Sequence, residues 1–209
     1  MKRTFLSKVL LMVVCLLIVS CSSDEVGVVN AQEPAQNVTN SKTLVLYYSF
    51  TNNVRTIVKS LGTKIKVDIV EVQPTEEGLD YAANNYAIGS NLIAAIRENP
   101  TVASSYPAIK SLNINLEDYD VIIVATPLWW SQMAAPMQTF LFHNGQKMAG
   151  KQIGLIVSSG SSGISSTVAD AKRLIPEGRF MEPNLWIRSS QVGNASALLD
   201  KWLTDIHLK

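Results

Sequence analysis

The chain has 209 residues, with 18 Lys or Arg against 17 Asp or Glu, which gives a formal net charge of +1. A charge this balanced provides no large basic surface of the kind that nucleic-acid binding needs, so we expect no nucleic-acid partner. The two histidines and two cysteines are not grouped at the spacing of metal ligands. We therefore expect no metal site.

The first 20 residues are typical of a bacterial secretory signal. Lys2, Arg3 and Lys8 precede an apolar run, "VLLMVVCLLIV", that is shorter than the roughly 20 residues of a membrane-spanning helix. The sequence "IVSC" at its end resembles the lipobox of bacterial lipoproteins, in which the cysteine is lipidated after cleavage. The resemblance implies a lipid anchor at Cys21, which attaches the protein to a membrane of the cell envelope on the periplasmic or the surface side.

Residues 21–41 are polar and show no helical or strand period, so we expect the lipidated residue to be followed by a flexible tether. Residues 42–209 then form one folded domain, whose length suits a single hydrophobic core. Removal of residues 1–20 takes away three basic residues and leaves 15 basic against 17 acidic ones, a net charge of −2. It also removes Cys15, so the domain has no disulfide.

Five apolar stretches of strand length follow one another, at residues 43–49, 67–72, 120–126, 152–158 and 184–188. The first, third and fourth are apolar at nearly every position, which is typical of strands covered by helices on both faces. Between the stretches, apolar residues recur at helical spacing. They are Ile57, Val58 and Leu61; Ile88, Leu92, Ile93 and Ile96; Val168, Ala171 and Ile175; Leu198, Leu199, Trp202, Leu203 and Ile206. The alternation predicts an α/β fold, a doubly wound parallel sheet with helices on both faces.

In such a sheet, ligands bind beyond the carboxyl ends of the strands. The loop after the first strand, "SFTNNVRT", carries the hydroxyls of Ser49 and Thr51 and the amides of Asn52 and Asn53 at the start of a helix. Free N–H groups and the dipole at a helix start favour a phosphate there. The same small polar residues also suit a helix cap, and both interpretations stay open on this loop alone.

The loop after the third strand begins "PLWWSQMAAP" and offers aromatic surface to a flat ring system. Adjacent residues point in different directions, so we expect one of Trp129 and Trp130 to face a ligand and the other to pack under the loop. The alternative is that both fill the core. Tyr81 and Tyr86 are candidates for a further wall, but we expect them to be surface or packing residues.

The loop after the fourth strand, "SGSSGISS", is rich in small residues. Gly160 and Gly163 permit close approach of the backbone to a ligand. Ser159 and Ser161 can present N–H groups to the polar edge of a ring.

Two of these loops carry a resemblance to the flavodoxin family. "YYSFTNNVRTIV" resembles its phosphate loop: Ser49, Thr51 and Asn53 match, whereas Asn52 stands where Gly is usual and Val54 where Thr is usual. Asn tolerates a positive φ, but Val54 lacks a hydroxyl donor worth about 1.5–3 kcal/mol. The "PLWWSQMAAPMQTFL" segment is similar to the family's second loop and matches at Pro127, Trp129, Trp130, Pro136, Thr139, Phe140 and Leu141.

The resemblance covers residues 42–206 and implies a five-stranded parallel sheet in the order 2-1-3-4-5, with FMN as cofactor. The residues implied to bind FMN are Ser49, Thr51, Asn52, Asn53, Val54, Pro127, Leu128, Trp129, Trp130, Ser159, Gly160, Ser161 and Gly163. No residue is assigned a catalytic role.

The resemblance further implies electron transfer or flavin-dependent reduction at the cell envelope. The partner would be a redox protein or a small-molecule electron acceptor such as a quinone. The changes at Asn52 and Val54 motivate an alternative, a non-catalytic module that keeps the scaffold, has lost FMN and binds another ligand or a protein. A hydrolase with Ser162 as nucleophile is disfavoured, because "GSSG" lacks the Gly-x-Ser-x-Gly turn.

Overall fold

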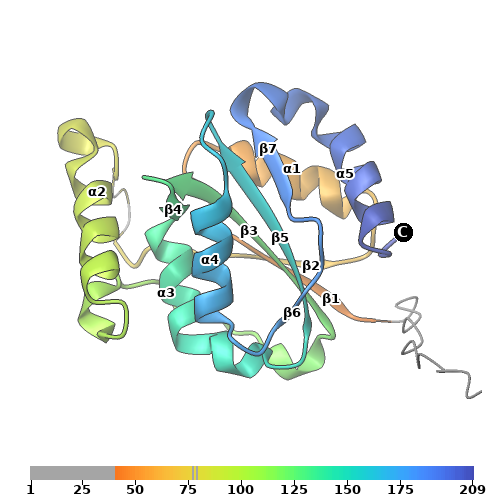
Figure 1. Ribbon diagram of the computed structural model, residues 1–209, viewed down its shortest axis with the longest axis horizontal. Coiled ribbons are helices and arrows are strands. Elements are labelled where there is room, and N and C mark those ends of the chain that lie inside the picture. The colour runs from red at the N-terminus through yellow and green to blue at the C-terminus, as the bar shows by residue number, and fades with distance from the viewer. Residues whose placement is uncertain (1–40, 77, 79) are drawn as a thin grey trace, which may run out of the picture. The chain divides into compact units, whose positions relative to one another are not determined.

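A computed structural model describes residues 41–76, 78 and 80–209 (Figure 1). The expected signal segment, Cys21 and nearly all of the expected tether lie outside the described residues. Within the described ranges, no helix is both long and apolar enough to cross a membrane.

The main sheet contains β1 (Thr43–Tyr47), β2 (Asp68–Glu71), β3 (Val121–Trp129), β5 (Gln152–Ser159) and β7 (Leu185–Arg188). These strands are parallel, with β1 between β2 and β3, β5 beside β3, and β7 on the far side of β5. The short strand β6 (Arg179–Phe180) pairs with β5 just before β7 does, so both occupy the same edge. The predicted doubly wound sheet and its order are confirmed.

The described residues form seven strands where five were expected, because β6 and β4 (Gln132–Met133) are only two residues long and give no periodic signal. β3 also runs three residues beyond its expected end at residue 126. Its last two residues, Leu128 and Trp129, pair antiparallel with Met133 and Gln132 of β4. The predicted loop after the third strand is therefore a hairpin that extends the sheet.

Helices cover both faces of the sheet (Figure 1). α1 (Asn53–Gly62) and α5 (Ala195–Asp205) pack on one face, and α3 (Ala135–Asn144) and α4 (Ser165–Leu174) on the other. α2 (Ala83–Glu98) lies beside α3, and its regular part starts at residue 87 because Asn84, Asn85 and Tyr86 have positive φ. Short 3₁₀ turns occupy Ala103–Ser105, Leu116–Asp118, Gly145–Met148 and Ser189–Asn194.

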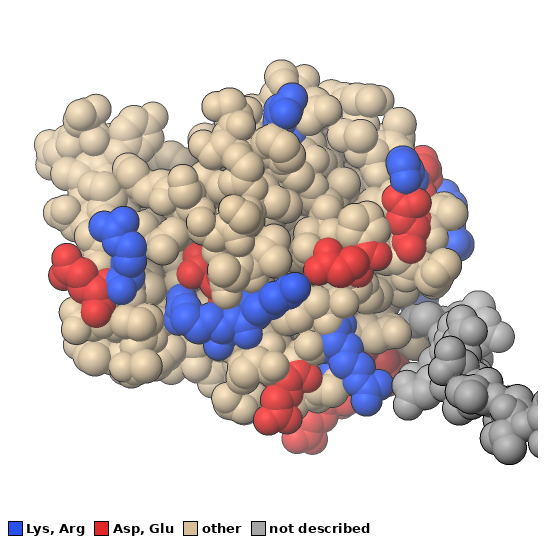
Figure 2. Space-filling view, in the orientation of Figure 1, with Lys and Arg blue, Asp and Glu red and all other residues tan. Residues whose placement is uncertain are grey.

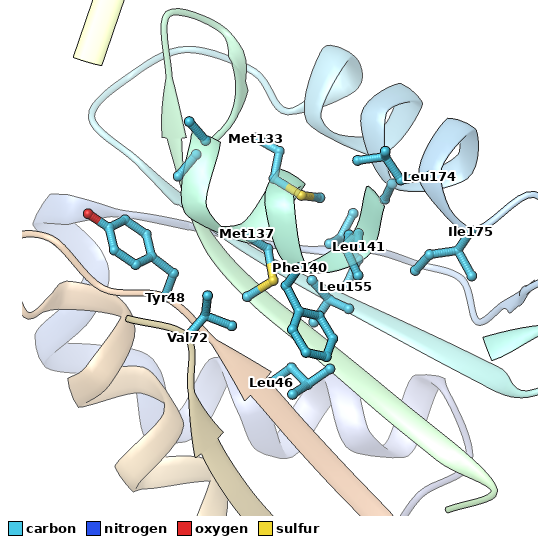
Figure 3. Packing of buried hydrophobic residues seen from close by; sticks show 14 of the residues in the cluster. Leu46, Tyr48, Val72, Met133, Met137, Phe140, Leu141, Leu155, Leu174 and Ile175 are labelled. Atoms are coloured by element: carbon cyan, nitrogen blue, oxygen red, sulfur yellow. The ribbon is translucent and has the colours of Figure 1, made fainter. Parts of the chain in front are cut away.

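Two apolar clusters, one on each face of the sheet, form the core. In Figure 3, Met137 and Phe140 of α3 lie over Leu46 of β1 and Leu155 of β5. Met133, the last residue of β4, is also fully buried in this cluster. The hairpin that ends β3 is thus attached to the core at its returning strand.

The contact between the ends of α3 and α4 requires glycine at residue 145, where an added Cβ would lie 1.9 Å from the carbonyl oxygen of Leu174. We predict that Gly145→Ala lowers the free energy of unfolding by about 1–3 kcal/mol, the usual effect of overpacking. Denaturant unfolding measures the change. The control is Gly193→Ala, because a Cβ there meets no atom within 4 Å. Equal stability of the two variants would contradict this account of the helix contact.

Candidate functional site

A cleft of about 390 Å³ lies where the carboxyl ends of the strands meet, within the range of about 300–1,000 Å³ found for small-molecule sites. The residues that line it come from the loops or ends of β1, β3, β5 and β7, from the segment before α2 and from the first turn of α2. They are Phe50, Thr51, Asn53, Tyr81, Tyr86, Pro127, Leu128, Trp129, Trp130, Ser158, Ser159, Gly160 and Ser189. None of these side chains is an acid, a lysine, an arginine or a histidine.

The structure brings the three predicted loops together at this cleft. Of the residues expected to bind a ligand, Thr51, Asn53, Pro127, Leu128, Trp129, Trp130, Ser159 and Gly160 line it. The remaining five, Ser49, Asn52, Val54, Ser161 and Gly163, are not among the lining residues.

The first loop leads into α1 through Asn52, which has φ 65° and so adopts the left-handed conformation that glycine usually supplies. The Ser49 hydroxyl accepts a hydrogen bond from the backbone N–H of Arg55 at 3.2 Å, so this residue does serve as a helix cap. The N–H groups of Asn53 and Val54, at the first turn, have no acceptor within the helix. They are available to an anion.

Val54 itself is 1% exposed, and its side chain packs in the apolar cluster between α1 and the sheet. Any contribution to anion binding comes from its backbone N–H. The threonine hydroxyl that is usual in the family is therefore missing at a position whose side chain points into the core.

Arg55 provides no positive charge inside the cleft. Its guanidinium donates hydrogen bonds to Oδ1 of Asn52 and to Oε1 of Glu71, both at 2.5 Å. Hydrogen bonds with Tyr47 and Glu71 raise the pKa of Arg55 above its ordinary value. The guanidinium is thereby neutralised by Glu71 on β2, and the cleft remains without a charged side chain.

The two tryptophans have different environments. Trp129 is 8% exposed, and its ring centroid lies 4.9 Å from that of Tyr81, 5.6 Å from Tyr48 and 5.9 Å from Phe50. Trp130 is 45% exposed and meets the half-exposed Tyr86 edge-on, with centroids 6.3 Å apart. Both rings line the cleft: one belongs to the aromatic core, and the other stands at the mouth.

The turn of the hairpin begins at Trp130, whose ring meets that of Trp129 edge-on with centroids 6.2 Å apart. Trp130 and Ser131 both have positive φ, 46° and 66°, so the backbone reverses within two residues. Across the mouth, Trp130 packs on Gly89 of α2, where an added Cβ would lie 2.9 Å from the indole ring. In Figure 2 the upper left of the visible face, over the first part of α2, shows no charged side chain, whereas basic and acidic side chains lie lower on the left and at the right, and a basic side chain also shows at the top.

A chain of hydrogen bonds joins the first loop to the loop after β5. The Asn53 amide donates to the Ser189 hydroxyl at 3.3 Å, and that hydroxyl donates to the Ser159 carbonyl at 3.2 Å. The Ser159 hydroxyl accepts from Nε1 of Trp186 at 2.8 Å and donates to the Ser162 carbonyl at 2.8 Å. These bonds fix the small-residue loop as a polar rim opposite the aromatic wall.

Five lining residues were not among those expected to bind a ligand: Phe50, Tyr81, Tyr86, Ser158 and Ser189, although Tyr81 and Tyr86 had been candidates for a further wall. Tyr81 was expected to be a surface or packing residue; it is 2% exposed, and its hydroxyl has no hydrogen-bond partner among the described residues. Burial, with a smaller effect of Glu76, raises the pKa of Tyr81 to about 12, so it stays a neutral donor. Ser189 directly follows β7, so it could have been found by inspecting the residues after every strand rather than after three of them.

Taken together, these features suit a ligand with a flat apolar ring at one end and an anionic group at the other. The aromatic wall would contact the ring, and the start of α1 would hold the anion. Among the described residues, no group of three or more His, Cys, Asp or Glu is placed to hold a metal ion.

Comparisons with known proteins agree with this geometry. A family model described as flavodoxin matches residues 42–206. A structure from Bacteroides eggerthii, of a protein assigned to the flavoproteins, is 26% identical over 81% of this chain and 100% of its own, with a TM-score of 0.64.

Two further structures share the fold. A flavoprotein from Lactobacillus acidophilus, solved in complex with FMN, is 23% identical over 75% of this chain and 99% of its own, with a TM-score of 0.59. A protein from Bacteroides uniformis, also assigned to the flavoproteins, is 21% identical over 78% and 98% of the two chains, with a TM-score of 0.57. Because the family model spans nearly all of the described sheet and helices, this chain belongs to the flavodoxin family.

Proposed function

We propose that this chain binds FMN in the cleft and takes part in electron transfer or flavin-dependent reduction. The observation that carries the proposal is the meeting, in one uncharged cleft, of an aromatic wall and the open start of α1. Membership of the flavodoxin family supports it, as does the related fold solved with FMN.

The residues present fit the phosphate end of FMN. The N–H groups of Asn53 and Val54, the hydroxyl of Thr51 and the amide of Asn53 are donors at the start of a ten-residue helix. A helix start of this kind stabilises negative charge without a lysine or arginine. Asn52 maintains the required turn, so its replacement of the family's glycine is no obstacle to binding.

The ring end fits as well. Trp130 and Tyr86 offer partly exposed aromatic faces at the mouth, and Trp129 and Leu128 form the inner wall. Opposite them, the rim of Ser158, Ser159 and Gly160 can present backbone groups to the polar edge of the ring. Bound FMN supplies the redox chemistry, and the protein orients it, shields one side from water and leaves the mouth open to an electron partner.

We also propose that the domain acts at the cell envelope, anchored through a lipid on Cys21. The charged start, the short apolar run and the "IVSC" sequence support this location. The electron partner would then be an envelope protein or a small-molecule acceptor that reaches the mouth of the cleft.

The first test is a titration of the purified protein with FMN, followed by tryptophan fluorescence and visible absorption. We expect saturation at one equivalent. Riboflavin, which lacks the phosphate, should bind at least about tenfold more weakly, because hydrogen bonds to a charged group are worth about 1.5–3 kcal/mol. Equal affinities would rule out the start of α1 as the phosphate site. A protein that ignores FMN would favour the non-catalytic module.

The contribution of the wall is tested at Trp130. We expect Trp130→Ala to weaken FMN binding by about two- to tenfold, the value of an aromatic contact, with little change in stability because the residue is 45% exposed. Trp130→Phe is the control and should retain most of the affinity. Trp129→Ala is unsuitable, since emptying its buried position should lower the free energy of unfolding by about 3–5 kcal/mol. Unchanged affinity in Trp130→Ala would remove this residue from the site.

The anchor is tested by growing bacteria that express the full chain with a radiolabelled fatty acid. We expect label on the protein and its recovery with membranes, because acyl chains contribute about 0.8 kcal/mol per buried methylene. Cys21→Ser should lose both the label and the membrane association, while Cys15→Ser serves as the control and keeps both. Membrane association without label would overturn the lipid anchor.

A further inference from the structure

Side chains from two helices hold the backbone of Met133 in β4. Its N–H donates to Oδ2 of Asp170, on α4, at 2.9 Å, and its carbonyl accepts from Nε2 of Gln138, on α3, at 2.8 Å. Gln138 is fully buried and Asp170 is 7% exposed. These bonds therefore lie inside the protein, where water cannot replace them.

Arg173 closes these contacts into a ring. Its Nη2 donates to Oε1 of Gln138 at 2.9 Å and to Oδ1 of Asp170 at 3.3 Å. We call the set of Met133, Asp170, Arg173 and Gln138 the Met133 ring. Nη1 of Arg173 also donates to the hydroxyl of Tyr106 at 3.3 Å, which ties the ring to the segment between α2 and β3.

The Met133 ring holds the strand on which the wall of the cleft depends. Met133 pairs with Leu128, and its neighbour Gln132 pairs with Trp129. Only the two-residue turn of Trp130 and Ser131 separates these strands. A shift of the Met133 backbone would therefore move both tryptophans, although no side chain of the ring lines the cleft.

We propose that Asp170 is a positioning residue that sets the aromatic wall of the cleft through the backbone of Met133. The proposal rests on the proposed binding of FMN. A buried carboxylate paired with arginine is weak evidence of stabilisation, because desolvation offsets much of the attraction. The carboxylate of Asp170, however, accepts a hydrogen bond from one backbone N–H of the hairpin, which gives it a more specific role.

The charge of Asp170 responds to pH in a defined direction. Burial raises its pKa, while hydrogen bonds from the Met133 N–H and from Arg173 act against that rise. Arg173 is the charged group facing it, α3 contributes the neutral Gln138, and β4 contributes a backbone N–H. The Tyr106 hydroxyl accepts from Arg173 and donates to the Pro100 carbonyl at 2.6 Å.

Because the pKa is higher in the folded chain than in the unfolded one, the folded chain binds more protons between the two values. The contribution of Asp170 to the free energy of unfolding therefore falls as pH rises from the ordinary pKa of 3.8 to the higher pKa of Asp170 in the folded chain. Protonation of Asp170 at low pH stabilises the fold, but it removes the ionic partner of Arg173. The stability and the positioning of the wall are thus expected to change in opposite directions.

The test compares Asp170→Asn with the unmodified protein. The amide can still accept from Met133, but its NH₂ group opposes the donors of Arg173. We expect FMN binding to weaken about tenfold at neutral pH. The ratio of the FMN affinity of the unmodified protein to that of Asp170→Asn should shrink as pH falls toward the ordinary pKa of an aspartate. The control is Asp205→Asn on α5, whose carboxylate pairs with Lys201 at 2.6 Å, and it should leave the ratio unchanged.

A second readout needs no FMN. The difference in fluorescence emission between each protein and its Trp130→Phe version isolates Trp130, and we expect Asp170→Asn to shift that difference. If the unmodified protein ignores FMN, the proposed function fails, and this emission test still decides the role of Asp170. If Asp170→Asn keeps both the affinity and the emission difference, the positioning role is overturned.

Arg173→Lys provides an independent variant in case Asp170→Asn does not fold. Arg173 is part-exposed, so the change should be tolerated, but a lysine ammonium cannot span Asp170 and Gln138 with the planar geometry of arginine. We expect the same shift in Trp130 emission and a smaller loss of FMN affinity. Unchanged emission and affinity in this variant would equally overturn the role of the ring.

Discussion

The cleft depends on how the backbone of one hairpin satisfies its hydrogen bonds beyond the edge of the parallel sheet. β3 leaves the sheet at its carboxyl end, where no parallel neighbour continues beside Leu128 and Trp129, and a buried backbone group without a partner is costly. The short return strand β4 satisfies part of this need, and side chains of α3 and α4 satisfy the rest at Met133. The position of the aromatic wall follows from that arrangement.

Much of the fold could be predicted from the sequence, because its long elements carry strong periodic signals. The continuous apolar runs in β1, β3 and β5 indicated strands covered on both faces, and the spacing of Ile57, Val58 and Leu61 indicated α1. β4 and β6 escaped prediction, since two-residue strands are defined by their partners and not by their own composition. For the same reason the end of β3 was placed too early.

The residues of the site were predictable only where a side chain suited to ligand binding also lay in a loop expected at the carboxyl end of a strand. Thr51, Trp129 and Gly160 lie in the loops expected after the first, third and fourth strands, so the topology of the sheet was enough to bring them together. Tyr81 reaches the cleft from a long connection, and nothing in the local sequence distinguishes it from a surface tyrosine. The Met133 ring was equally hidden, because it joins residues 133, 138, 170 and 173 through the packing of two helices.

The absence of charged side chains among the residues that line the cleft has a kinetic consequence. Charged clefts attract ligands of opposite sign over distances of about a Debye length, and their association rates fall as salt rises. Here the nearby guanidinium of Arg55 is paired with Glu71, and an anion at the start of α1 is held by hydrogen bonds and by a helix dipole whose effect is confined to the first turn. An anionic ligand would therefore arrive by unassisted diffusion, at a rate that ionic strength hardly alters. The cleft would then select among ligands by their dissociation rates, after they have entered.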